Sequence, residues 1–108
     1  MIETWMKNDL KKPVIVKTFH GKLFKDDNQG NQIGVELTDN GQAVNLTGTT
    51  ITGYIIRPDN QTITVAGSVS GNKASIILPS TAYAVSGEVS IAIKAGSTTI
   101  GACSIYVR

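Results

Sequence analysis

Short runs of β-forming residues, each closed by a cluster of turn residues, dominate this chain. Apolar and polar residues alternate through residues 32–38 and 87–95, and a similar run closes the chain at residues 98–108. Because successive residues of a strand point to opposite faces, each run has one apolar face. Runs spaced about 8–12 residues apart, with turn signals between them, are typical of β-sandwiches. The sequence therefore predicts an all-β fold, an antiparallel immunoglobulin-like β-sandwich.

The run at residues 46–58, LTGTTITGYIIRP, carries apolar groups on both faces. Ile51 and Ile55 point one way, and Tyr54 and Ile56 point the other. This pattern indicates a strand near the middle of the sandwich that is covered on both sides. Pro58 lacks a backbone N–H and cannot donate to a neighbouring strand, so the strand is expected to end there.

Two connections can be assigned a geometry from their residues. Asn40-Gly41 lies between two strand-like runs and predicts a type I′ hairpin turn, in which both central residues have positive φ. Residues 79–84 predict a single helical turn that crosses between the two sheets. In the last run, we expect Ile100 to share a face with Tyr106, opposite Cys103.

The positive charge of the chain is concentrated at its start. Residues 1–25 hold six lysines against two carboxylates, a net charge of +4, whereas the whole chain carries only +2. Weak helical spacing and the lack of a clear cap favour an arm at residues 1–12, in front of a sandwich at residues 13–108. A basic arm suits an acidic partner surface, although it would also serve solubility alone.

The arm supplies the candidate partner-binding residues. They are Trp5, Lys7, Lys11 and Lys12. Trp5 is the only tryptophan of the chain, and a large aromatic residue on an arm is expected to pack on something, with a neighbouring chain favoured over this domain.

No catalytic motif surrounds the reactive residues. His20 is the only histidine and Cys103 the only cysteine, so no internal disulfide can form. A nucleophile would need His20 beside it and an orienting carboxylate such as Asp26, and no family signature flanks any of them. We predict that the chain is not an enzyme, with Cys103 a half-buried strand residue and His20 a strand-edge side chain.

Metal, nucleotide and nucleic-acid sites are not expected either. Asp26, Asn28 and Gly30 only begin a calcium-loop pattern, because Asn31 and Leu37 stand where that loop needs glycine and glutamate. No glycine-rich phosphate loop follows a strand, and the lysines of the arm lack interleaved aromatic residues. No apolar run approaches the ~20 residues needed to span a membrane.

Aromatic residues leave one binding function open. Tyr54, Tyr83 and Tyr106, together with Trp5, could line a sugar-binding face, since aromatic rings stack on pyranose rings. Their spacing does not place them on one surface, and each can equally pack in the core or at a sheet edge. A small carbohydrate-binding module is therefore kept as an alternative function.

Several stretches resemble a known family when they are taken together. They are IGVELTDNG (33–41), VNLTG (44–48), GYIIRPD (53–59), GNKASIILP (71–79) and YAVSG (83–87). Over about residues 14–108 the chain resembles the N-terminal immunoglobulin-like domain of tailed-phage baseplate upper proteins, and it is similar to phage fibre-base proteins. The order of the pieces carries this resemblance, since no single piece is specific.

This resemblance implies a structural role in the virion. The domain would anchor a host-adsorption apparatus to other virion proteins of the baseplate, tail or capsid, as a homo-oligomer in which a trimer is favoured, without a cofactor. Residues 1–10 contain charged residues and no apolar signal-peptide core, so synthesis in the bacterial host cytoplasm is expected. A capsid decoration or head-fibre base protein is the alternative within this class.

Two further expectations concern the ends of the chain. In the family, receptor binding belongs to a more C-terminal module, so a chain ending at Arg108 is expected to be either a fragment or a small auxiliary protein. Removal of residues 1–12 is expected to leave the fold intact and to abolish incorporation into particles.

Overall fold

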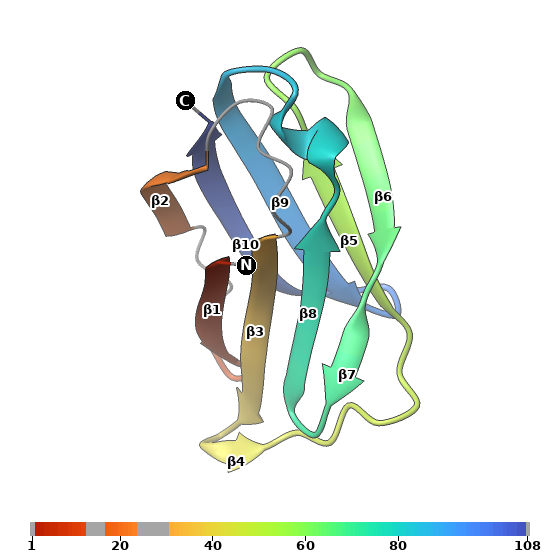
Figure 1. Cartoon of the computed structure of the whole chain (residues 1–108). Helices are drawn as coiled ribbons and strands as arrows, with labels where there is room; N and C mark the ends of the chain where they lie inside the picture. The colour runs from red at the N-terminus through yellow and green to blue at the C-terminus, as the bar shows by residue number, and fades with distance from the viewer. Residues whose placement is uncertain (1, 13–16, 24–30, 108) are drawn as a thin grey trace.

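The computed structural model describes residues 2–12, 17–23 and 31–107, which form two β-sheets packed face to face (Figure 1). The elements are β1 (Ile2–Asp9), β2 (Lys17–Leu23), β3 (Asn31–Asp39), β4 (Gln42–Ala43), β5 (Ile51–Ile56), β6 (Thr62–Ala66), β7 (Ser68–Ser70), β8 (Lys73–Leu78), the short 3-10 helix η1 (Ser80–Tyr83), β9 (Gly87–Ala95) and β10 (Thr98–Val107). The predicted all-β sandwich is confirmed.

Each sheet is antiparallel at its centre and has one parallel pair. The first sheet has the order β1-β3-β8-β7, with β4 also paired to β3, and the second has the order β2-β10-β9-β5-β6. β1 runs parallel to β3, and β2 runs parallel to β10. The sequence predicts antiparallel pairing throughout, and these two parallel pairs are the exceptions. Each lies at the end of its strand order and is formed by one of the two N-terminal strands.

The N-terminal segment is a strand of the sandwich rather than the separate arm that the sequence predicts. β1 is in register with β3 from the pair Ile2–Asn31 to the pair Asp9–Thr38. Met6 is only 1% exposed and belongs to the hydrophobic core. The prediction rested on weak helical spacing and overlooked the alternation of Trp5, Met6 and Lys7, in which the middle residue points inward.

The core fills the space between the inner faces of the two sheets. Val89, Ile91 and Ile93 of β9 are buried, as the alternation in residues 87–95 predicts. Ile33 and Val35 of β3 face them from the first sheet. A continuous set of β-branched side chains therefore holds the two layers together.

The predicted side of Ile100 is wrong. Ile100 is 2% exposed and belongs to the core, together with Cys103. The register between β10 and β9 shifts between Thr99 and Gly101. Such a β-bulge inserts one extra residue into the strand, so the residues before it point to the opposite face from the one that strict alternation predicts. Counting alternate residues back from Cys103 therefore places Ile100 on the wrong face.

The strand that starts at Ile51 is interior to its sheet but is covered on one face only. β5 pairs with β9 on one side and β6 on the other. Ile51 and Ile55 are buried, whereas Tyr54 and Ile56 are 37% and 45% exposed. Two-sided cover needs a third layer, and this sandwich has two, so the second apolar face of β5 lies on the surface.

The connections carry the expected geometry. Asn40 and Gly41 have φ of 51° and 84°, which confirms the type I′ hairpin turn. η1 (Ser80–Tyr83) joins β8 of the first sheet to β9 of the second, which confirms the predicted helical turn. A second crossing lies at Gly67, where the chain leaves β6 of one sheet and enters β7 of the other (Figure 1).

Candidate interaction surfaces

The predicted reactive residues do not form a site in the described part of the chain. Cys103 is 1% exposed on the inner face of β10, and burial raises the pKa of its thiol to about 12. A buried thiol of this kind is a poor nucleophile because almost none of it is ionised. His20 lies in β2, but its side chain lies outside the described residues, as do Asp26, Asn28 and Gly30 of the calcium-like pattern.

The described residues contain neither a cluster of metal-binding side chains nor a membrane-spanning helix. Across residues 2–12, 17–23 and 31–107, acidic, histidine and cysteine side chains nowhere gather in a group of three that could hold a metal ion. Within the same ranges, the structure contains no helix of the length and apolarity needed to cross a membrane.

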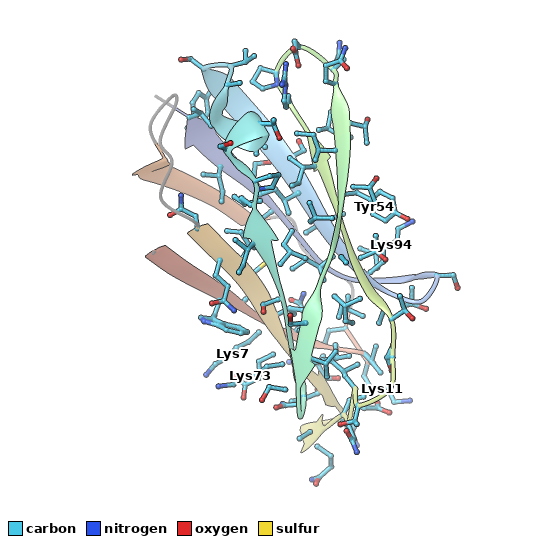
Figure 2. All side chains as sticks on the ribbon, turned by 45° about the vertical axis from the view of Figure 1, so that its right-hand side comes forward. Lys7, Lys11, Tyr54, Lys73 and Lys94 are labelled. Carbon is cyan, nitrogen blue, oxygen red and sulfur yellow. The ribbon has the colours of Figure 1, made fainter. Side chains whose placement is uncertain are left out.

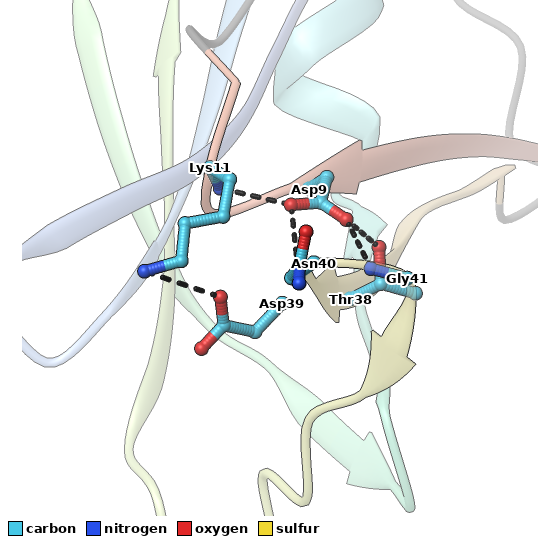
Figure 3. Close-up of polar contacts among 6 residues, drawn as sticks. All are labelled: Asp9, Lys11, Thr38, Asp39, Asn40 and Gly41. Atoms are coloured by element: carbon cyan, nitrogen blue, oxygen red, sulfur yellow. Dashed lines mark hydrogen bonds and ion pairs between the residues drawn. The ribbon is translucent and has the colours of Figure 1, made fainter.

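Asp9 fastens the end of β1 to the hairpin that follows β3 (Figure 3). One carboxylate oxygen accepts hydrogen bonds from the Asn40 and Lys11 amides, at 3.0 and 2.8 Å. The other accepts from the Gly41 amide at 2.9 Å and the Thr38 hydroxyl at 2.8 Å. These hydrogen bonds stabilise the charged carboxylate and hold the pKa of Asp9 well below its usual range. The bond from Gly41 has the largest effect, followed by those from Lys11 and Thr38.

We expect Asp9→Asn to lower the melting temperature at pH 7, because a neutral amide offers one acceptor oxygen in place of two charged ones. A carboxylate with a lowered folded-state pKa stabilises the fold fully above its ordinary pKa of 3.8, and this stabilisation is lost as the pH falls through the folded-state value. The difference in melting temperature between parent and variant should therefore shrink in strong acid.

Thermal unfolding followed by circular dichroism at pH 7, 5, 3 and 2 tests this expectation. Glu36→Gln is the control, since it removes the same charge from the partly exposed face of β3, where no hydrogen bond to the hairpin is made. Equal melting temperatures for parent and Asp9→Asn at pH 7 would show that Asp9 does not hold the hairpin.

The lysines predicted to bind a partner lie near the C-terminal end of β1. Lys7 is on the outer face of β1, and Lys11 and Lys12 follow the strand. Lys11 Nζ lies 3.8 Å from the Asp39 carboxylate, an exposed ion pair of little energetic weight. A hollow of about 370 Å³ beside them is lined by Lys7, Asn8, Asp9, Lys12, Glu36 and Thr38. Carboxylates stand among these lysines, so the surface is mixed in charge rather than purely basic.

Trp5 lies two residues before Lys7, on the same outer face of β1. Its indole covers Gly34, its partner in β3, so closely that a Cβ at Gly34 would meet Trp5 Cζ3 at 2.3 Å. Trp5 is 39% exposed, and the Lys73 ammonium lies 5.6 Å from the ring centroid. Sequence reasoning did not identify Gly34, although a glycine inside an alternating strand signals a close approach of this kind.

An apolar patch occupies the outer face of the second sheet. Tyr54, Ile56 and Tyr106 are 37%, 45% and 43% exposed there. A groove of about 200 Å³ runs past this patch, with a lining of Tyr54, Ile56, Ser90, Ile91, Ala92, Ala102, Cys103 and Ser104. Lys94 Nζ lies 5.1 Å from the Tyr54 ring centroid. Tyr54, Ile56 and Tyr106 are called the tyrosine face below.

The structure separates the aromatic residues that could have formed one sugar-binding surface. Trp5 lies on the outer face of the first sheet, whereas Tyr54 and Tyr106 lie on the outer face of the second. Figure 2 shows the two sides, with Lys7 and Lys73 on one and Tyr54 with Lys94 on the other. The side chain of Tyr83 lies outside the described residues. No common face therefore unites Trp5 with the two described tyrosines.

Comparison with known proteins finds similarity in structure alone. No protein-family model matches the chain, and no curated protein sequence matches it. Among solved structures, the chain is similar to the N-terminal domain of phage TP901-1 ORF48, with a TM-score of 0.63 and 11% sequence identity. The match covers 100% of this chain and 99% of that domain. At this identity, the likeness establishes the fold.

Proposed function

We propose that this chain is a non-enzymatic structural domain of a tailed-phage virion, made in the host cytoplasm and placed at the baseplate or at the base of a fibre. The end-to-end structural likeness to a phage domain is the observation that carries this proposal. The stretches that resemble baseplate upper proteins support it, because they include the confirmed hairpin turn at Asn40-Gly41.

The tyrosine face is the surface proposed to contact other virion proteins. Three large apolar side chains lie on it, next to a groove whose lining is mostly small or apolar. Aromatic residues around an apolar groove are enriched in the centres of protein interfaces, where charged residues are depleted. Copies of this chain, with a trimer favoured, are proposed to assemble with the baseplate, tail or capsid protein that receives them.

The end of β1 supplies a second contact in this proposal. Lys7, Lys11 and Lys12 remain the proposed polar contacts, and Trp5 is proposed to lie at their margin. Exposed lysines interspersed with carboxylates favour a complementary polar partner and contribute more to specificity than to affinity. Many weak contacts suffice in a particle, because repeated copies bind with avidity.

The location on the particle can be tested by immunogold electron microscopy, with an antibody to this domain and particles purified from the source. Label at the tail tip is the expected result. Label over the head would instead indicate a capsid decoration or head-fibre base protein. Absence of label on every particle would contradict the virion proposal.

Ile56→Lys tests the tyrosine face directly. Because Ile56 is 45% exposed, we expect the variant to fold normally and to be incorporated into particles at least tenfold less than the parent, since a charge is then buried in the contact. Ile77→Lys is the matched control, because Ile77 is 54% exposed on the outer face of β8, in the opposite sheet, and receives the same substitution. Quantitative immunoblotting of purified particles gives the ratio, and equal incorporation of all three proteins would contradict this use of the face.

A further inference from the structure

Trp5 lies in a row of residues that crosses strands β1, β3, β8 and β7 of the first sheet. Trp5 is paired with Gly34, Gly34 with Ser75, and Ser75 with Ser68. Gly34 has no side chain, so the indole packs directly over its backbone, while 39% of Trp5 stays exposed. The row therefore consists of an aromatic plate at one end and hydroxyl groups at the other.

A hollow of about 330 Å³ lies along this row. Its lining is Trp5, Gln32, Ser68, Val69, Ser70, Lys73 and Ser75. The volume is within the range of about 300–1,000 Å³ that is usual for small-molecule sites. Gln32 Nε2 donates to Ser75 Oγ at 2.8 Å, so two of the polar groups are already held in place. This hollow is called the tryptophan hollow below.

The chemistry of the tryptophan hollow matches that of a pyranose ring. A pyranose has an apolar C–H face, which packs on the electron-rich face of an indole, and a rim of hydroxyl groups. Serine hydroxyls, the Gln32 amide and the Lys73 ammonium offer both donors and acceptors to such a rim. An apolar ligand would leave these groups unpaired, at a cost in free energy.

The charges around the hollow select among ligands that stack on tryptophan. Among the side chains that the structure describes, Lys73 is the one charged group in the lining of this hollow. Glu36 is paired with Lys73 on one side and with Lys7 on the other, so the adjacent row alternates in sign. A nucleic-acid strand needs a continuous basic track beside the stacking residue, and this alternation interrupts one. A neutral sugar needs no cation, because it can accept a hydrogen bond from Lys73, and a singly anionic sugar needs only one cation.

We infer that the tryptophan hollow binds a pyranose residue of a polysaccharide, with Trp5 as the stacking plate and Gln32, Lys73 and Ser75 as hydrogen-bonding groups. This site is separate from the tyrosine face, and it shares Trp5 with the margin of the β1 contact proposed above. It differs from the sugar-binding face that the sequence suggested, which combined Trp5 with three tyrosines, because no tyrosine is among the residues that line this hollow.

The single tryptophan makes the test direct, because every change in indole emission reports on Trp5. The full chain is titrated with the trisaccharides of glucose, galactose, N-acetylglucosamine and glucuronic acid, and with an oligothymidylate. At least one trisaccharide is expected to give a saturable change, with a dissociation constant on the order of 1 mM. No saturable change with any trisaccharide up to ~20 mM, or a tighter response to the oligothymidylate, would overturn the inference.

A matched pair of lysine variants locates the site. Lys73→Met should weaken sugar binding about fivefold, the effect of one exposed hydrogen bond. Lys94→Met is the control, because Lys94 also lies over an aromatic ring, that of Tyr54, on the opposite sheet. Circular dichroism confirms that both variants fold. Equal affinities for the parent and Lys73→Met, or equal weakening by both variants, would place any binding outside the tryptophan hollow.

Discussion

A chain that lacks residues 1–9 will lose the cooperative unfolding transition of the full chain. This expectation reverses the one drawn from the sequence, in which residues 1–12 were dispensable for folding. Met6 is buried in the core, and its methyl group lies so near β10 that a Cβ at Gly101 would meet it at 3.2 Å. The Asn8 amide donates to the carbonyl of Ile100 at 2.6 Å, so β1 is joined to both sheets.

The expected loss is large compared with the stability of a small domain. Loss of a buried methionine side chain alone costs about 2–5 kcal/mol. Loss of the whole strand adds the ladder to β3 and leaves that edge open to other chains. Domains of this size are stable by only about 5–15 kcal/mol, so little would remain.

Urea unfolding followed by circular dichroism measures this effect, with light scattering to detect association. The control is the full chain with Lys7→Gln, which removes the lysine charge that the truncation removes and retains the strand. We expect that control to unfold like the parent. A truncated chain with a transition midpoint close to that of the parent would show that β1 only rests on the domain, as a separate arm would.

Gly67→Val is expected to cost about 3 kcal/mol, because no space exists for a side chain where the strand changes sheets. A Cβ at Gly67 would lie 2.7 Å from the backbone oxygen of Ser75 and 2.5 Å from Ile51 Cγ2. The Gly67 amide also donates to the Ile51 carbonyl at 2.8 Å, so the residue cannot easily move away. Backbone atoms of both sheets therefore confine this position.

Ser68→Val is the matched control for Gly67→Val. It introduces the same side chain one residue later, at an exposed position of β7, where a β-branched residue suits a strand. Its free energy of unfolding is expected to stay within about 0.5 kcal/mol of the parent. A urea midpoint for Gly67→Val equal to that of Ser68→Val would show that the crossing can relax to accept a side chain.

The candidate surfaces were only partly predictable from the sequence. Trp5 was singled out because a lone tryptophan near a terminus is unusual, but Gly34 and Ser75 join it only through strand pairing. Asp9 was overlooked because its hydrogen-bond donors, among them Asn40 and Gly41, lie about thirty residues away. A short-range pattern carries no information on partners at such separations, since each strand pair can form in many registers.

Local chemistry was enough to determine the fold class, the turns and most of the core. Alternation of apolar and polar residues identified the buried faces of β3 and β9. Asn40-Gly41 predicted the type I′ turn because asparagine and glycine adopt the positive φ angles that this turn requires more readily than other residues do. Only the tertiary structure decided that β1 is part of a sheet, that Ile100 lies inside and that Ile56 lies on the surface. These outcomes depend on which strands become neighbours and on how many layers form, and both result from the packing of the whole chain.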